Sequence, residues 1–163
     1  MNVSIEPIMI EQKPVFVQLM ELYSYDFSEY SGEDVSEYGY FGYPHIDDYW
    51  NEPGRYPFFI RVDGKLAGLA LVRSCCEYAQ LAHPHCMAEF FVMRKYRRRG
   101  VGRIAAGMVF DRFPGGWEVS QWRSNLPAQR FWQRVISGYT HGRYDAFDCA
   151  EQDVVGFTFD NSD

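Results

Sequence analysis

Residues 86–103 place a basic turn between a stretch of strand length and a run with helical spacing. The stretch at 86–93 is largely apolar, and the turn after it contains Arg97, Gly100 and Gly102. Apolar residues then recur at helical intervals, at Val101, Ile104, Ala105 and Met108. The first turn of a helix carries backbone N–H groups without internal partners and a partial positive charge, so this order of elements predicts an anion-binding site.

Other interpretations of the turn are less favoured. An isolated turn of this composition is often a capped surface turn with a solvated basic face, but the strand before it and the helix after it favour an anion site. The turn lacks the glycine-lysine spacing of a Walker loop. It fits the dinucleotide pattern G-x-G-x-x-A from Gly100 to Ala105, yet the acidic residue required about 20 positions later is offered only by Glu118. We therefore favour an anion site of another kind.

The rest of the chain alternates between strand and helix patterns. Strands are predicted at 3–10, 57–62, 65–72, 117–122, 139–147 and 154–159, with Asp63-Gly64 as a hairpin turn. Helices are predicted from Pro14 onward and around 128–136, and 30–50 is interpreted as a loop with a short helix. The 163 residues, 47% of them hydrophobic, are enough for one core. We predict one α/β (α+β) domain over residues 1–163, with a mixed, largely antiparallel sheet of six to seven strands flanked by helices.

The net charge of −6 is unevenly distributed along the chain. Residues 1–52 hold eleven acidic side chains and one basic one, whereas residues 94–103 hold six basic side chains. Proteins that bind nucleic acid through phosphate contacts are normally basic, so we expect no nucleic-acid partner. No apolar run reaches the roughly 18 to 20 residues of a membrane span, and the N-terminus lacks a signal-like pattern. We expect a cytoplasmic protein with no membrane partner.

The cysteines and neighbouring histidines do not form a metal or redox pattern. Cys75, Cys76, Cys86 and Cys149 lack C-x-x-C spacing, so free thiols are expected. His83 and His85 precede Cys86, but no second group of ligands at a metal-binding spacing completes the set. We predict no metal site.

The motifs around the basic turn resemble those of the GNAT superfamily of acetyl-CoA-dependent N-acetyltransferases. Val92 is followed after five residues by Arg97-x-x-Gly100-x-Gly102, as in that family. A second family element, Asn, two residues, Ala, two residues and an apolar-aromatic pair, is matched by Asn125, Ala128, Phe131 and Trp132. The resemblance covers roughly residues 3–159 and is strongest to a bacterial branch of predicted acetyltransferases.

This resemblance implies a GNAT-like fold and acetyl-CoA as co-substrate, with an acetyl-CoA-binding core at about 86–137. The backbone at Val92 would pair with the pantetheine arm, and Asn125, with Ala128 and Trp132 of the same motif, would contact the cofactor. The pyrophosphate would lie on the turn formed by Arg97, Arg98, Arg99, Gly100, Val101, Gly102 and Arg103. Core packing remains the alternative for Val92, and helix capping the alternative for Asn125.

The sequence indicates the catalytic residues less clearly than the cofactor-binding residues. Many family members carry tyrosine where Trp132 stands, and an indole N–H does not protonate a leaving thiolate. Tyr139 or solvent would take that part. Glu89 is the candidate base for the acceptor amine, with His83 and His85 as alternates, although Glu89 could equally be a solvated outward side chain. We expect direct transfer without a covalent cysteine step, with a backbone N–H such as that of Val92 stabilising the oxyanion.

The acidic and aromatic N-terminal third suggests the acceptor. Residues at about 11–55 fall where family members build the acceptor pocket, and they could attract a cation and cover its apolar parts. The acids concerned are Asp26, Glu29, Glu33, Asp34, Glu37, Asp47 and Asp48. We expect a small, cationic primary amine as the acceptor, with a homodimer as one possible assembly. The alternatives are a merely solvated, packed segment and, for the protein, a non-catalytic CoA- or nucleotide-binding sensor or interaction module.

Overall fold

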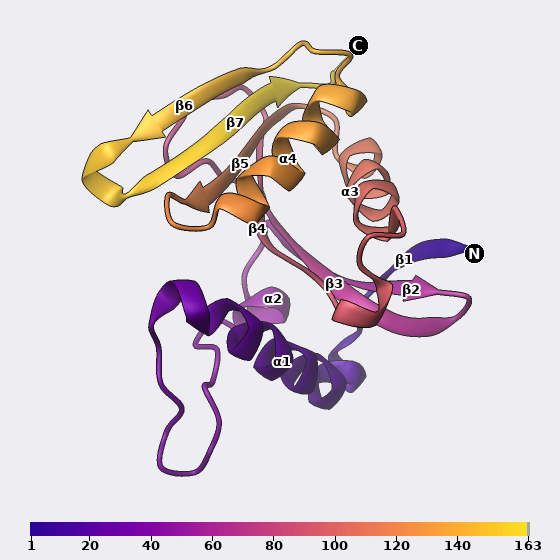
Figure 1. Cartoon of the computed structure of the whole chain (residues 1–163). Coiled ribbons are helices and arrows are strands. Elements are labelled where there is room, and N and C mark those ends of the chain that lie inside the picture. Colours follow the sequence, from indigo (N-terminus) through magenta and orange to yellow (C-terminus); the bar gives the residue numbers. More distant parts are fainter. Residues whose placement is uncertain (163) are drawn as a thin grey trace.

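A computed structural model describes residues 1–162, within which seven strands form one sheet in the order β1-β2-β3-β4-β5-β7-β6 (Figure 1). The strands are β1 (Val3–Pro7), β2 (Arg55–Val62), β3 (Lys65–Arg73), β4 (Pro84–Val92), β5 (Gly116–Trp122), β6 (Asp145–Cys149) and β7 (Val154–Asp160). The helices are α1 (Lys13–Ser31), α2 (Asp48–Asn51), α3 (Val101–Arg112) and α4 (Leu126–Tyr139). The strand pair β4–β5 is parallel and the other neighbouring pairs are antiparallel, which confirms the mixed, largely antiparallel sheet.

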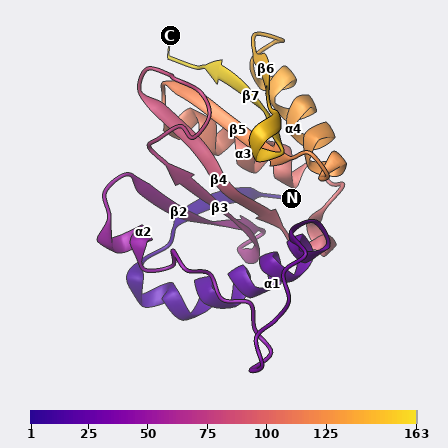
Figure 2. The same ribbon diagram turned by 90° about the vertical axis from the view of Figure 1, so that its left-hand side faces the viewer.

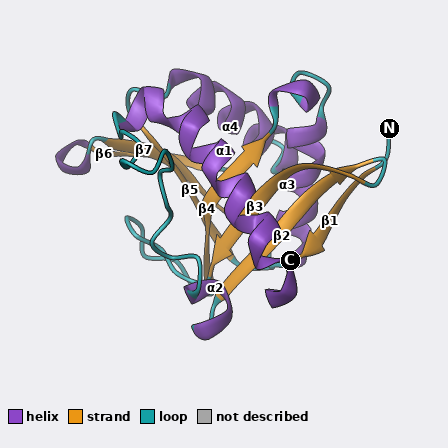
Figure 3. Ribbon diagram, turned by 90° about the horizontal axis from the view of Figure 1, so that it is seen from below, coloured by secondary structure: helices purple, strands orange, loops and turns teal. Residues whose placement is uncertain are grey.

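Helices cover both faces of the sheet (Figure 3). One hydrophobic cluster joins the sheet to α3 and α4 through residues such as Val109 and Ile136. A second cluster, on the opposite face, joins it to α1 and α2 through Phe16, Met20 and Tyr49. The alternating strand pattern of β3 supplies both clusters, with Ala70 and Val72 in the first and Leu69 and Leu71 in the second.

Strands β4 and β5 separate after a short parallel contact. Pairing between them covers only Pro84 to Cys86 against Gly116 to Glu118. Beyond Cys86, β4 stays paired with β3 on one side, while its other edge faces a gap between the two halves of the sheet (Figure 2). The diverging strands leave backbone N–H and C=O groups of β4 available to a ligand.

A bulge changes which face of the sheet each β4 residue occupies. Val72 of β3 pairs with Met87 and Leu71 with Glu89, so Ala88 is the extra residue. Met87 and Phe90 pack in the cluster under α3 and α4, whereas Ala88 and Phe91 pack on the α1 side. The bulge therefore turns Glu89 toward α1, where strict alternation after Met87 would have placed it on the opposite face.

Most predicted elements are present, with one clear error. Asp63 and Gly64 form the hairpin turn with φ of 49° and 76°, as the sequence predicts. The strand expected at 139–147 is wrong at its start, because α4 continues to Tyr139 and β6 begins only at Asp145. Residues between them form a turn in which His141 has φ of 53° and Gly142 has φ of 81°. The helical spacing from Ile136 to Tyr139 continues for one more turn than we expected.

Candidate active site

A cavity of about 1060 Å³ lies where β4 and β5 separate. Its walls come from α1, the 43–45 loop, β2, β3, the loop after β3, and the starts of α3 and α4. The basic turn borders the cavity on one side, and Glu89 lies on another wall with residues of the N-terminal third. The two regions that the sequence analysis treated separately thus meet in one space.

The N-terminus of α3 is suited to an anion. Gly100 precedes the helix with φ of 82°, Arg98 has φ of 61°, and no side chain caps the first turn. The first N–H groups of the helix are therefore left without side-chain acceptors, and Arg98 and Arg103 line the cavity beside them. A pyrophosphate could bind these donors together with the positive end of the helix.

Gly102 has a second constraint besides access for a ligand. A Cβ at this position would lie 3.0 Å from two ring atoms of Phe131 in α4. The glycine thus permits close packing of α3 against α4, and its lack of a Cβ also leaves the backbone open to a ligand.

Nine of the eleven expected cofactor-binding residues line the cavity: Val92, Arg97, Arg98, Gly100, Gly102, Arg103, Asn125, Ala128 and Trp132. The other two do not. Val101 is buried in the core beneath α3, and Arg99 is exposed outside the cavity lining. The Asn125 side chain accepts a hydrogen bond from the Ala128 N–H at 3.1 Å, so it caps α4 as well as lining the cavity.

The backbone of Val92 faces the gap between the strands. The N–H of Met93 donates to the Ala67 carbonyl in β3, at 2.8 Å, and successive N–H groups of a strand point in opposite directions. The N–H and C=O of Val92 therefore lie on the open edge. Arg97 Nε donates to the Val92 carbonyl at 2.6 Å, which leaves the N–H of Val92 as a donor toward the cavity.

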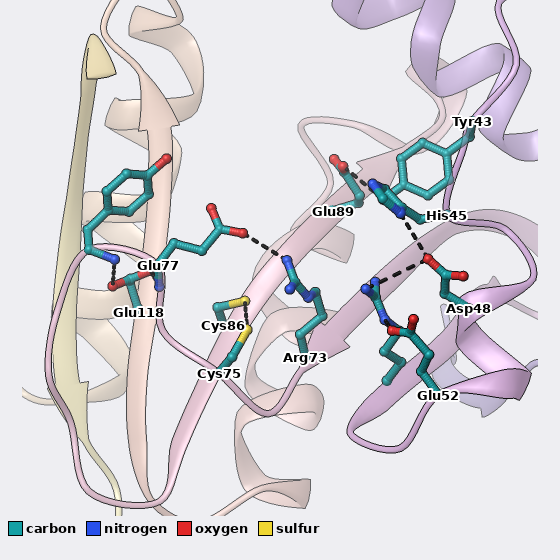
Figure 4. Close-up of polar contacts among 12 residues, drawn as sticks. Tyr43, His45, Asp48, Glu52, Arg73, Cys75, Glu77, Cys86, Glu89 and Glu118 are labelled. Atoms are coloured by element: carbon teal, nitrogen blue, oxygen red, sulfur yellow. Dashed lines mark hydrogen bonds and ion pairs between the residues drawn. The ribbon is translucent and has the colours of Figure 1, made fainter. Parts of the chain in front are cut away.

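Glu89 lies in the cavity wall between the phenols of Tyr23 and Tyr43, and Figure 4 shows it beside Tyr43. The Tyr23 hydroxyl of α1 donates to one carboxylate oxygen, and the Tyr43 hydroxyl donates to the other at 3.4 Å. Burial raises the pKa of Glu89 to about 7, although both hydrogen bonds and His45 oppose the rise and Glu77 adds to it. The carboxylate is thus not an outward, solvated group, and it can exchange a proton near neutral pH.

The other candidate catalytic residues lie elsewhere. The Tyr139 hydroxyl donates to Asp111 at 2.8 Å, accepts from Asn161, and is absent from the lining of the cavity among residues 1–162. His85 contacts the Pro114 carbonyl at 3.3 Å, and burial lowers its pKa. Neither His83 nor His85 lines the cavity. Their placement gives no support to a role as acid or base.

Most of the expected acids lie outside this cavity, and Glu33 and Asp34 line a second pocket at the end of α1. Asp26 and Glu29 line the cavity, but Asp26 forms ion pairs with Arg94 at 3.0 Å and Arg97 at 2.6 Å, and so balances the basic turn. Asp47 pairs with Lys13, and Asp48 pairs with His45. A cationic acceptor therefore depends on fewer carboxylates than the sequence suggests.

Sequence reasoning missed the contact of Tyr23 with Glu89 and the structural part of Glu118. The Glu118 side chain is buried and accepts the N–H groups of Glu77, Tyr78 and Ala79 at 2.9, 3.0 and 2.7 Å (Figure 4). It holds the β3–β4 loop against the point where β4 and β5 separate. An acid between Trp117 and Val119 in an apolar strand was the available signal.

The separated parallel strands, the uncapped basic helix end and the Glu89 carboxylate thus surround one cavity. Residues 16–137 match the model of the acetyltransferase (GNAT) family. The chain therefore belongs to the GNAT acetyltransferase family, as the sequence motifs predict, and this family uses acetyl-CoA.

Solved structures share the fold. An acetyltransferase from Thermus thermophilus has a TM-score of 0.70 at 13% identity, covering 98% of this chain and 97% of that one. PaiA N-acetyltransferase from Thermoplasma acidophilum, in complex with coenzyme A, has a TM-score of 0.61 at 12% identity, covering 98% and 99%. An aminoglycoside acetyltransferase from an uncultured soil metagenomic sample, in complex with sisomicin, has a TM-score of 0.60 at 17% identity, covering 82% and 86%. A comparison with curated protein sequences finds no match.

Two features are absent from residues 1–162. No group of three or more His, Cys, Asp or Glu side chains is arranged to hold a metal ion there. No helix in the same part of the chain has the length and apolar character needed to cross a membrane.

Proposed function

We propose that this protein transfers the acetyl group of acetyl-CoA directly to the primary amine of a small acceptor. The observation that carries the proposal is the position of Glu89, held by two phenols in a cavity whose other wall is the uncapped, basic start of α3. A group that can accept a proton near neutral pH and a site for an anionic cofactor thus share one space.

The cofactor would lie across the opening between β4 and β5. The N–H groups at the start of α3, with Arg98 and Arg103, would hold the pyrophosphate, and the open edge of β4 near Val92 would pair with the amide-bearing arm. Arg97 would act indirectly, because its guanidinium is already engaged by Asp26 and the Val92 carbonyl. The Thermoplasma protein, which has this fold, was solved in complex with coenzyme A, and this supports a CoA ligand for the present chain.

Glu89 would prepare the amine for attack. An amine that enters as an ammonium ion gives one proton to the Glu89 carboxylate, and its nitrogen then bonds to the thioester carbonyl carbon. The Val92 N–H, on the open edge, would donate to the oxygen that gains charge. As the carbon–sulfur bond breaks, the nitrogen would release its remaining excess proton to solvent, and the thiolate would take a proton from solvent, because Trp132 offers none. The amine form of the acceptor is therefore the species that reacts.

Steady-state turnover tests this proposal. Purified protein is incubated with acetyl-CoA and a panel of small amines, including aminoglycosides, while thiol release and the acetylated product are measured. We expect acceptor-dependent thiol release from the wild type, and a loss of about 100-fold or more in Glu89→Gln, in line with the usual contribution of a general base. Glu29→Gln, which alters an acid of the same cavity that interacts with Tyr30 and not with Glu89, is the control and should lose much less.

The alternative is a non-catalytic protein that binds CoA or another nucleotide. Trp132 favours it, because this buried indole packs against Phe90 and Phe131 at the position where a proton donor is common in the family. Stabilisation by acetyl-CoA without thiol release for any amine would select this alternative over catalysis.

A further inference from the structure

Two arginines lie side by side in the acceptor half of the cavity. Arg55 of β2 and Arg73 of β3 are direct cross-strand partners, and both line the cavity. They lie on the sheet face that Leu71 shares with α1, which is also the face to which the bulge turns Glu89. Like charges directly opposite one another destabilise a sheet, so this pair requires an explanation beyond sheet stability.

Arg55 is held by two acidic side chains and an aromatic ring. Its guanidinium contacts Glu52 at 2.9 Å and Asp48 at 3.8 Å and lies over the Tyr49 ring, 5.6 Å from the centroid. The side chain is only 12% exposed. Arg55 is therefore a fixed positive charge in the cavity wall.

Arg73 has guanidinium N–H donors that the described part of the protein does not use. Its Nη1 donates to Glu77 at 2.8 Å (Figure 4), and within residues 1–162 no other hydrogen bond of its guanidinium is formed. A guanidinium has five N–H donors in a planar fork. The side chain is 31% exposed and lines the cavity, so the remaining donors are accessible to a ligand.

A buried hydroxyl beside the arginines also lacks a partner. The Tyr49 hydroxyl is buried without a hydrogen bond in the part of the chain that the structure describes. Burial and the Glu89 carboxylate raise the pKa of Tyr49, while the neighbouring Tyr43 hydroxyl, Arg55 and Arg73 lower it, so polar and charged groups surround this hydroxyl. A buried polar group without a partner is rare and marks a place where a ligand or water oxygen fits.

We infer that Arg73, backed by Arg55, forms an anion subsite for the acceptor, and that the acceptor is an amino carboxylate whose amine lies at Glu89 and whose carboxylate lies on Arg73. This inference rests on the proposed function for its substrate role. Glu89 is opposite Leu71, and Arg73 follows Leu71 by two residues on the same face. That separation is about 7 Å along the strand, which side chains of this length bridge around a molecule of amino-acid size.

The local charge favours a carboxylate over a phosphate. Asp48, Glu52 and Glu77 already balance much of the positive charge of the two arginines. A carboxylate is planar and carries one negative charge, so it matches the free side of the Arg73 guanidinium. A phosphate dianion would be repelled more strongly by the three neighbouring carboxylates. The subsite thus narrows the acceptor from amines in general to those with a nearby carboxylate.

A binding experiment tests the subsite without relying on turnover. The protein saturated with CoA is titrated by calorimetry with the common α-amino acids, each compared with its carboxamide and its decarboxylated amine. Loss of one charge-assisted hydrogen-bonded pair corresponds to about 10- to 100-fold in affinity, so we expect at least one amino acid to bind about 10-fold or more tightly than its carboxamide. Arg73→Gln should remove this preference, Arg73→Lys should retain part of it, and Arg61→Gln, on β2 outside the cavity lining, should leave it intact.

The outcomes separate the two proposals. Equal binding of acids and carboxamides, or a preference that survives in folded Arg73→Gln, overturns the subsite. Acetylation of amines with and without carboxylates at equal rates, unaffected by Arg73→Gln, also overturns it and leaves the proposed function standing. A carboxylate preference that depends on Arg73, without thiol release, supports the subsite and contradicts the transferase reaction. If Arg73→Gln does not fold, Arg73→Lys tests the subsite by itself. Lysine lacks the planar fork of the guanidinium, so this variant must show a weaker preference for the amino acid over its carboxamide.

Discussion

Replacing Tyr23 by phenylalanine removes one hydroxyl from the Glu89 carboxylate and keeps the ring. The Tyr23 hydroxyl donates to Glu89, and this hydrogen bond holds the pKa of the carboxyl below the value that burial alone would give. Its loss should therefore raise the pKa of Glu89, because the ionised form loses a donor while the burial remains.

The size of the shift follows from the strength of such a bond. A hydrogen bond to a charged group contributes about 1.5–3 kcal/mol, and one pKa unit corresponds to about 1.4 kcal/mol. Starting from a pKa of about 7, the variant should titrate about one to two units higher. At pH 7 the ionised fraction would fall by about 5- to 50-fold, and at pH 9 most of the difference would disappear.

The assay is kcat/KM for the acceptor as a function of pH, measured for wild type and Tyr23→Phe. We expect the acidic limb of the profile to move to higher pH in the variant. Tyr30→Phe is the matched control, because Tyr30 lines the same cavity but interacts with Glu29. An unchanged acidic limb in Tyr23→Phe would show that the group titrating in the profile is not Glu89.

Three further results are expected. Glu118→Ala should lower the free energy of unfolding, measured in urea, by about 3 kcal/mol or more, because three loop N–H groups lose their acceptor. Ser120→Ala on the same strand is the control and should lower the free energy of unfolding by less than about 1 kcal/mol. Gly102→Glu should abolish the rise in melting temperature that acetyl-CoA causes. Gly107→Glu is the control and should retain this rise, because no atom lies within 4 Å of a Cβ at that position. Equal rises in the two variants would contradict the anion site at α3. Glu89 keeps its proton up to about pH 7 in the folded protein, whereas the unfolded chain releases it near pH 4.5. The free energy of unfolding of the wild type should therefore fall by roughly 3 kcal/mol, relative to that of Glu89→Gln, as the pH rises between these values. A difference that stays constant with pH would argue against the raised pKa.

The fold was predictable where its signals are local. The Asp63-Gly64 turn, the helical spacing after Pro14 and the strand, turn and helix around Gly100 each lie within a short stretch of sequence. The family motifs are equally local, and nine of the eleven expected cofactor-binding positions line one cavity. The strand expected from residue 139 failed because tyrosine favours strands while the helical spacing from Ile136 carried α4 onward.

The acceptor side was less predictable because its contacts join distant residues. Tyr23 meets Glu89 across 66 positions, and Arg97 meets Asp26 across 71. Arg55 and Arg73 become neighbours only through the register of the β2–β3 hairpin. Charge counts along the chain placed Asp26 with the acceptor, whereas folding pairs it with the cofactor turn, so a local excess of acids does not identify the ligand that they face.

Because of the bulge at Ala88, the sheet face that the Glu89 carboxylate occupies depends on the number of residues between it and Met87. With Ala88 present but no bulge, strict alternation from Met87 would direct Glu89 toward the aromatic core beneath α3 and α4, whereas deletion of Ala88 would remove the bulge and keep Glu89 on the α1 side. A chain of this family without the bulge must therefore carry its acid one residue, and not two, after the position of Met87 to place it on the α1 side. When chains of this family are aligned, a one-residue gap here decides whether an acid in β4 is equivalent to Glu89 or lies on the other side of the sheet.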